Sequence, residues 1–320
     1  MRRPDAASAA AAAAVPATAS AAPSPALDAA RTLYAIAGGL AWAGEMATRR
    51  RMAADAAPPG ELVPAVALDT LTGSTTRALG PLLGGVIYQF AGIGIAAGIA
   101  AALHLVALRL AWRVTPAPRA AAHGNPFAGI GEAMRLVAGS SVLRMVLGVT
   151  MVMNVFAFSY NSILPAFGSL AFGASSAAIG LLAAAEPFGA LLGGLWIALG
   201  RRTPPGTLPL VLGSVLFLLL LLVVAQTQAY AVAWILLALG GLGTARFAAM
   251  QTSLVMTAAP PEMRSRVLGL VTTCIGMGPF GVLAIGALAD GLGPRHAILA
   301  MAATGLALMA TLLLSEARRK

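Results

Sequence analysis

Charged residues are scarce in this chain of 320 residues: Asp, Glu, Lys and Arg together make up 10% of it, whereas 59% is hydrophobic. A soluble domain typically carries roughly 25% charged residues and about 45–50% apolar ones. With so little polar cover, a soluble globule would leave large apolar areas facing water. The composition therefore predicts a membrane-embedded protein, and its long apolar runs predict that this protein is all-α.

Cysteine and histidine are also rare, which excludes further classes of protein. Cys274 is the single cysteine, so no intramolecular disulfide can form, and the three histidines stand in separate segments. No pair of them has metal-ligand spacing, and the chain contains no zinc-protease, phosphate-loop or nucleophile-elbow motif. An intramembrane enzyme would need a buried Ser/His or Asp/Asp dyad with a supporting motif, and none is present. We therefore expect no metal, no cofactor and no enzymatic activity.

Basic residues outnumber acidic ones by 21 to 11, which gives a net charge of +10. They form no stripe with interleaved aromatic residues, so nucleic acid is not an expected partner. Instead they stand in small groups between apolar runs. Because a spanning helix needs about 20 apolar residues, the chain predicts nine spans, near residues 33–48, 65–89, 93–112, 142–166, 175–199, 207–227, 229–256, 266–288 and 296–315.

Every second gap between the predicted spans is basic. Such gaps contain Arg49 to Arg51, Arg201 with Arg202, and Arg264 with Arg266, and the chain ends in Arg318, Arg319 and Lys320. Since cytoplasmic loops carry an excess of Lys and Arg, these gaps and the C-terminus are predicted to be cytoplasmic. The protein is then a multi-pass protein of the plasma (inner) membrane, with the lipid bilayer as a partner.

Two short sequences recur at one offset. Gly38-Gly39-Leu40 returns as Gly240-Gly241-Leu242, and Ala56-Ala57-Pro58-Pro59 returns as Ala258-Ala259-Pro260-Pro261, both 202 residues later. A parallel repeat of this length with six spans is typical of a transporter made of two six-helix halves. The partners of the first three spans of the second half would fall before residue 26. The chain is therefore expected to lack three helices of the first half.

This repeat defines four regions. Residues 1–30 are expected to form a disordered Ala- and Pro-rich leader, and residues 31–113 a partial N-terminal bundle of three helices. Residues 114–141 are expected to form a cytoplasmic linker with a short amphipathic helix at Glu132–Ala138. Residues 142–320 are expected to form a complete C-terminal bundle of six helices.

Two stretches carry a resemblance to a known family: Arg77-Ala78-Leu79-Gly80-Pro81-Leu82-Leu83-Gly84-Gly85 and Pro261-Glu262-Met263-Arg264-Ser265-Arg266-Val267. From about residue 31 onward, the chain resembles the major facilitator superfamily, in particular its drug and siderophore exporter branch of proton-coupled antiporters. The resemblance implies a helical bundle of that type and export of small amphipathic molecules in exchange for protons, by alternating access. It also implies that Arg77, Gly80, Pro81, Gly84 and Gly85 form the packing seam of the antiporter motif; ordinary glycine-rich helix packing is the alternative.

The chain departs from the family pattern because the first three helices and their loop motif are not found. The alternative to a transporter is therefore a truncated, non-transporting membrane fragment, from a mis-called start or a degenerate gene. In the second half, Arg201 and Arg202 keep the basic loop, but Ala198 stands where an acidic residue is expected.

Ionisable residues inside spans are expensive and tend to face a cavity or a partner. Under the repeat, Glu45 and Arg246 lie at nearly the same depth in symmetry-related helices, so we expect them to contribute a polar layer to the central cavity. Glu186 precedes Pro187, which frees a backbone carbonyl. It is either a protonation site or a structural hydrogen-bonding residue.

The predicted span 142–166 contains the polar side chains of Asn154, Tyr160 and Asn161 near its middle and second half. This span would also border the cavity, so they are candidates for binding substrate. Polar side chains in spans also commonly hydrogen-bond to a neighbouring helix, which is the alternative interpretation.

Overall fold

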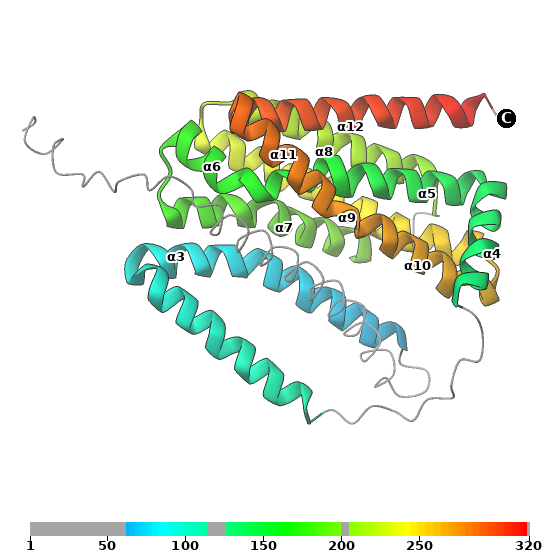
Figure 1. Cartoon of the computed structure of the whole chain (residues 1–320), viewed down its shortest axis with the longest axis horizontal. Helices are drawn as coiled ribbons and strands as arrows, with labels where there is room; N and C mark the ends of the chain where they lie inside the picture. The colour runs from blue at the N-terminus through cyan, green and yellow to red at the C-terminus, as the bar shows by residue number, and fades with distance from the viewer. Residues whose placement is uncertain (1–61, 114–125, 200–204, 319–320) are drawn as a thin grey trace, which may run out of the picture. The chain divides into compact units, whose positions relative to one another are not determined.

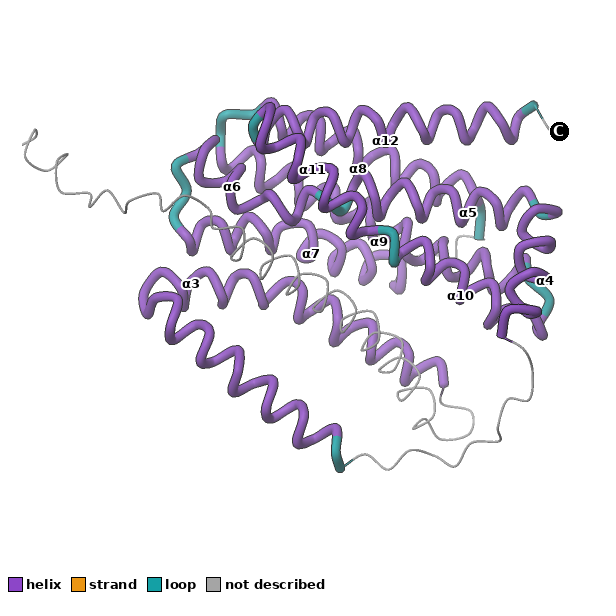
Figure 2. Tube along the Cα trace, viewed as in Figure 1, coloured by secondary structure: helices purple, strands orange, loops and turns teal. Residues whose placement is uncertain are grey.

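The computed structural model describes residues 62–113, 126–199 and 205–318, and the regular structure within these ranges is helical (Figures 1 and 2). In chain order the elements are α3 (Leu62–Ala111), α4 (Pro126–Gly139), α5 (Ser141–Val152), the π-helix η1 (Met153–Ala157), α6 (Tyr160–Phe172), α7 (Ser176–Leu199), α8 (Thr207–Gln226), α9 (Tyr230–Ala258), the 3-10 helix η2 (Pro261–Met263), α10 (Arg264–Ile275), α11 (Gly278–Leu292) and α12 (Pro294–Ala317).

Seven segments of the described chain are long and apolar enough to cross a membrane. They are Thr75–Ala111, Ser141–Phe172, Ser176–Leu199, Thr207–Gln226, Tyr230–Ala258, Pro261–Leu292 and Pro294–Ala317. The prediction of an all-α, multi-pass membrane protein is confirmed. The predicted count of nine spans is not confirmed, and the first predicted span, 33–48, lies with the leader outside the described residues.

The first of these segments belongs to a helix that turns back on itself. α3 has 50 residues, which at 1.5 Å per residue would extend to about 75 Å, far beyond the roughly 30 Å of a hydrocarbon core. Gly92 interrupts it with φ 78° and ψ 172°, a backbone conformation that is essentially restricted to glycine. Figure 1 shows α3 as two arms joined by this bend. The predicted spans 65–89 and 93–112 correspond to the two arms.

Two other predicted spans are broken in the middle. The span that begins at Ser141 changes from α5 to η1 and then to α6, and the span after η2 changes from α10 to α11 around Gly276. The first turn of α11, just after the second break, lies against η1, since a Cβ atom built on Gly281 would stand 2.0 Å from the carbonyl oxygen of Val155. Only glycine permits this approach of α11 to η1.

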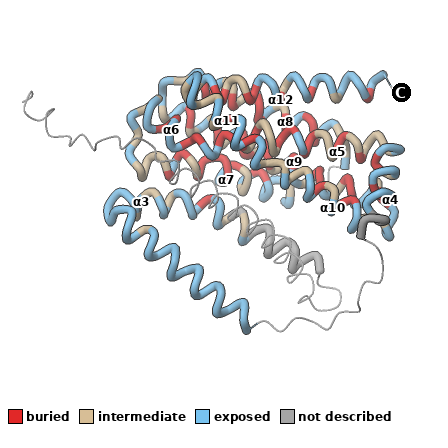
Figure 3. The backbone as a smooth tube through the Cα atoms, in the orientation of Figure 1, coloured by how far each residue is buried: buried red, intermediate tan, exposed pale blue. Residues whose placement is uncertain are grey.

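The core lies among the helices from α5 onward. Large side chains with almost no exposed surface include Tyr160, Phe167, Phe217, Leu143 and Leu237. In Figure 3 the buried positions concentrate on these helices, whereas the second arm of α3 is almost entirely exposed. Apolar side chains remain exposed on many outer helix faces, as expected where lipid rather than water is the solvent.

α4 includes the residues expected to form the linker helix. Ala133 and Val137 are buried on one side of it, whereas Met134 and Arg135 are exposed on the other. α4 packs against α5 and α10. It therefore lies on the end of the bundle at which α5 begins and α12 ends.

Candidate functional site

A buried carboxylate joins three helices. Glu186 on α7 is 1% exposed, and one of its oxygens accepts a hydrogen bond of 2.9 Å from the guanidinium of Arg77 on α3. Its other oxygen accepts a 2.6 Å hydrogen bond from the hydroxyl of Thr244 on α9; the carbonyl oxygen of Gly241, at 3.0 Å, is a second acceptor within reach of the same proton. A guanidinium and a hydroxyl are suitable partners for a buried carboxylate, because both hydrogen-bond to the charged form.

Close helix crossings bring these three side chains together. A Cβ atom on Gly241 would lie 2.2 Å from the carbonyl oxygen of Glu186, and one on Gly189 would lie 1.8 Å from that of Ala238. Glycines therefore allow α7 and α9 to touch at the backbone. Thr244 stands three residues beyond Gly241, less than one turn further along α9, and reaches the Glu186 carboxylate from there.

The contact between α3 and α7 depends on the end of the antiporter-like motif. A Cβ atom on Gly85 would lie 2.5 Å from the carbonyl oxygen of Ser176, and one on Gly180 would lie 2.3 Å from that of Pro81. At Gly80 and Gly84, an added Cβ atom would have no described atom within 4 Å. The structure thus places Pro81 and Gly85 at this contact, together with Arg77 one turn earlier, and turns Gly80 and Gly84 away from it.

Tyr160 borders the Glu186 site. Its ring packs edge-on against Phe217 at 5.9 Å between centroids, and the residue is 1% exposed. Its hydroxyl makes no hydrogen bond of normal geometry among the described residues, although it lies within electrostatic range of Asn161, Glu186 and Arg77. Of the three polar side chains predicted from the span 142–166, Tyr160 is buried, Asn154 is half-buried and Asn161 is exposed.

The other polar candidates are dispersed. The side-chain amides of Asn154 and Asn161 donate to the carbonyls of Thr150 and Phe158 in their own span. Arg246 is exposed on α9, and its suggested counterpart Glu45 lies outside the described residues. The polar layer of Glu45 and Arg246 therefore remains a prediction.

Of the four predicted basic loop residues, two are described by the structure and two are not. Arg264 donates to the carbonyl of Ala259 at 3.3 Å, and Arg266 forms an exposed ion pair with Glu132 of α4. Arg201 and Arg202 lie outside the described residues.

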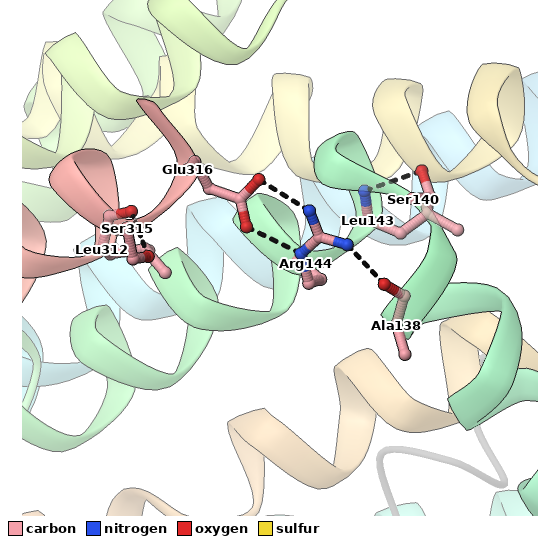
Figure 4. A network of polar contacts seen from close by, with 7 residues as sticks. All are labelled: Ala138, Ser140, Leu143, Arg144, Leu312, Ser315 and Glu316. Atoms are coloured by element: carbon pink, nitrogen blue, oxygen red, sulfur yellow. Dashed lines mark hydrogen bonds and ion pairs between the residues drawn. The ribbon is translucent and has the colours of Figure 1, made fainter. Parts of the chain in front are cut away.

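A third ion pair among the described residues was not predicted from the sequence. Arg144 on α5 donates to both carboxylate oxygens of Glu316 on α12, at 2.7 and 2.8 Å, and also to the carbonyl of Ala138 at the end of α4 (Figure 4). The side chains of Arg144 and Glu316 are 22% and 8% exposed. The sequence did hold a signal for this pair: Arg144 lies inside a predicted span, and Glu316 directly follows the last predicted span. Thr244 was missed because one hydroxyl in an apolar helix carries no sequence signal.

Neither of these networks has the composition of a metal or cofactor site. Among the residues that the structure describes, no group of three His, Cys, Asp or Glu side chains could hold a metal ion. What the Glu186 site offers chemically is a buried carboxylate bonded to a guanidinium on one side and to a hydroxyl on the other.

Comparison with known proteins identifies the fold. The family model of the Major Facilitator Superfamily matches residues 2–280 and, in a second overlapping match, residues 149–320. No curated protein matches the chain.

Among solved structures, the chain is similar to a bacterial homologue of the human lysosomal transporter Spinster in its inward-facing, unoccupied conformation. The TM-score is 0.56 at 17% identity, over 84% of this chain and 73% of that one. The inward-facing, occupied conformation gives a TM-score of 0.53 at 16% identity with the same coverage. At such identities the likeness shows the fold, and fold and family together support a secondary transporter rather than an enzyme. The chain belongs to the major facilitator superfamily.

Proposed function

We propose that this protein exports small amphipathic molecules in exchange for protons, and that Glu186 is the side chain that takes up the proton. The observation that carries this proposal is the ion pair between Glu186 and Arg77. The Glu186 side chain is only 1% exposed, and Arg77 lies 109 residues earlier in the sequence, on another helix. Ionisable groups at such positions inside membrane proteins commonly mark proton or substrate pathways.

The location of the bond supports a role in alternating access. α3 belongs to the region expected to form the N-terminal bundle, and α7 to the C-terminal one. Transporters of two repeated halves work by rocking one half against the other. A bond between α3 and α7 therefore favours the conformation in which these helices touch.

Protonation supplies the switch between the two conformations. While Glu186 is ionised, it attracts Arg77 across the contact of α3 with α7. When it binds a proton, the charge attraction is lost, whereas the Thr244 hydroxyl can still hydrogen-bond to the neutral carboxyl. The contact between α3 and α7 then weakens and the two helices can separate. Arg77 is 58% exposed at its side chain, so it can leave the pair without crossing a packed core.

Two further features of the proposal are the chemical class of the substrate and the direction of transport. The amphipathic class and the outward direction follow from the resemblance of Arg77 to Gly85 to the antiporter motif of exporters. The Spinster homologue is described as a transporter homologue in occupied and unoccupied states, which supports transport of a small molecule by this fold.

The test is transport by the full chain reconstituted in vesicles with an imposed pH gradient, with ethidium and tetraphenylphosphonium as probes and a trapped pH dye as proton readout. We expect probe movement that follows the gradient and is coupled to opposite proton movement. Glu186→Gln should abolish the effect of the gradient, whereas Glu262→Gln, a change at an exposed carboxylate of η2, should retain it.

Two results would contradict the proposal. Equal gradient dependence in Glu186→Gln and Glu262→Gln would exclude Glu186 as the proton acceptor. Absence of any probe or proton movement in the unaltered chain would favour the non-transporting fragment instead.

A further inference from the structure

A cavity of about 550 Å³ opens at the end of the bundle opposite α4. Its walls come from three places in the chain: the last turns of α6, the loop before α9, and the start of α12. The lining residues are Phe167, Leu170, Ala171, Gln228, Gly293, Pro294 and Arg295. In Figure 1 the end of α6 and the turn between α11 and α12 lie at one end of the bundle, whereas α4 and the C-terminus lie at the other. Glu186 stands ten residues after the start of α7 at Ser176, about 15 Å along that helix from the end where the cavity opens, so the two sites are separate.

Arg295 supplies a positive charge to this cavity. Its guanidinium carbon stands 5.9 Å from the centroid of the Phe167 ring, a distance at which the ring attracts a cation. Within the described ranges, no carboxylate lies within ion-pair distance of Arg295; Asp290, five residues earlier on α11, is exposed and makes no pair with it. The charge is thus positioned by an aromatic ring and is not neutralised by an acidic side chain of the described chain.

The rest of the lining is divided between polar and apolar groups. The Gln228 side chain offers an amide that can donate two hydrogen bonds. The first turn of α12 adds backbone N–H groups at the positive end of a helix of 24 residues, which also favours an anion. Phe167, Leu170 and Ala171 form an apolar wall on α6.

We propose that this cavity binds an anionic amphiphile, with its phosphate or carboxylate on the Arg295 guanidinium and the first carbons of its tail on the α6 wall. A guanidinium binds such groups through two parallel hydrogen bonds, and Gln228 lies where it can donate another. The ligand has two possible sources: the headgroup of a membrane lipid, or an amphiphile that arrives from water. The chemistry of recognition is the same for both, and the site is independent of proton coupling at Glu186.

The test measures binding of hexyl phosphate to the full chain in nanodiscs of phosphatidylcholine by calorimetry, with hexanol and inorganic phosphate as partial probes. We expect hexyl phosphate to bind more tightly than either partial probe. Arg295→Gln should weaken it about 10- to 100-fold, since charge-assisted hydrogen bonds contribute about 1.5–3 kcal/mol. The affinity of Arg295→Lys for hexyl phosphate should lie between that of the unaltered chain and that of Arg295→Gln, because lysine keeps the positive charge but lacks the two parallel donors.

The matched control is Arg109→Gln, which removes an exposed arginine from the second arm of α3 and should leave the affinity unchanged. Each variant is compared with the unaltered chain by its thermal unfolding, so that loss of binding is separated from loss of folding. A folded Arg295→Gln variant that binds hexyl phosphate as tightly as Arg109→Gln would overturn the proposal.

A second experiment distinguishes the two possible sources of the ligand. If the cavity holds lipid headgroups, nanodiscs that contain phosphatidylglycerol should suppress hexyl phosphate binding by the unaltered chain. If the ligand is water-borne, binding should persist in these nanodiscs. Equal binding of hexanol and hexyl phosphate in either lipid would show an apolar site and refute the anion site.

Discussion

Replacement of Gly85 by alanine tests the contact on which the α3–α7 pair depends. The added Cβ atom would lie 2.5 Å from the carbonyl oxygen of Ser176 and 3.0 Å from the Cα atom of Gly180. Both are backbone atoms, so neither can rotate away as a side chain could. α3 and α7 must move apart, which lengthens the 2.9 Å hydrogen bond between Arg77 and Glu186. The variant should therefore lose stability and weaken the ion pair together.

The magnitude follows from two opposing contributions. Forcing an extra methyl group into a packed contact costs about 1–3 kcal/mol, whereas alanine in place of glycine in a helix gains up to about 1 kcal/mol. Subtracting a gain of about 1 kcal/mol from a cost of about 1–3 kcal/mol leaves a net loss of about 0–2 kcal/mol for Gly85→Ala. Gly84→Ala should gain stability from the higher helix propensity of alanine without creating a clash, because no described atom lies within 4 Å of the added Cβ atom.

The assay is equilibrium unfolding of both variants and the unaltered chain in mixed micelles with increasing SDS, followed by tryptophan fluorescence and far-ultraviolet circular dichroism. We expect Gly85→Ala to unfold at lower SDS than the unaltered chain, and Gly84→Ala at equal or higher SDS. If Gly85→Ala proved as stable as Gly84→Ala, the close approach of α3 to α7 would be refuted, and with it the geometric basis of the Arg77–Glu186 bond.

Two further predictions concern stability away from this contact. Glu316→Gln should lower stability, because it leaves the Arg144 guanidinium without its paired charge; thermal unfolding measures the loss, and Arg144→Gln combined with it should recover part of the stability. Gly293→Ala should cost about 1–3 kcal/mol, because Gly293 adopts φ 82° and ψ 158° at the turn between α11 and α12. Thermal unfolding measures this loss as well.

Each of these predictions has a control in the same region. Ser315→Ala changes an exposed hydroxyl beside Glu316 that bonds only within α12, and should leave stability nearly unchanged. Gly291→Ala adds a methyl group inside α11 without a contact within 4 Å, and should be neutral or stabilising. A double variant of Arg144 and Glu316 no more stable than Glu316→Gln alone would contradict the uncompensated charge as the cause. Equal effects of Gly293→Ala and Gly291→Ala would contradict the conformational argument.

Much of the fold was predictable because its signals are local in sequence. The apolar runs predicted the helices from α5 to α12 within a few residues at most ends, and the glycine-rich stretch Gly80 to Gly85 marked a site of close helix contact. Local patterns did not predict the breaks within the spans at η1 and around Gly276. These breaks occur where two helices cross, and the apolar composition on either side is the same as in an unbroken helix.

The site was predictable only as a set of separate residues. Glu186 and Arg77 stood out because charge is costly in a membrane, but their eventual pairing was hidden by a separation of 109 residues, and that of Arg144 with Glu316 by 172. Which face of a helix meets which neighbour depends on small differences in backbone approach at Gly85, Gly180 and Gly241.

The amino-acid sequence by itself determined that this is a helical membrane protein with most of its charged residues outside the spans, since that follows from composition and from the length of apolar runs. Tertiary structure alone decided which of the remaining charges meet. The rotation and register of packed helices are set by contacts between distant segments, and those contacts place a carboxylate of α7 between a guanidinium of α3 and a hydroxyl of α9.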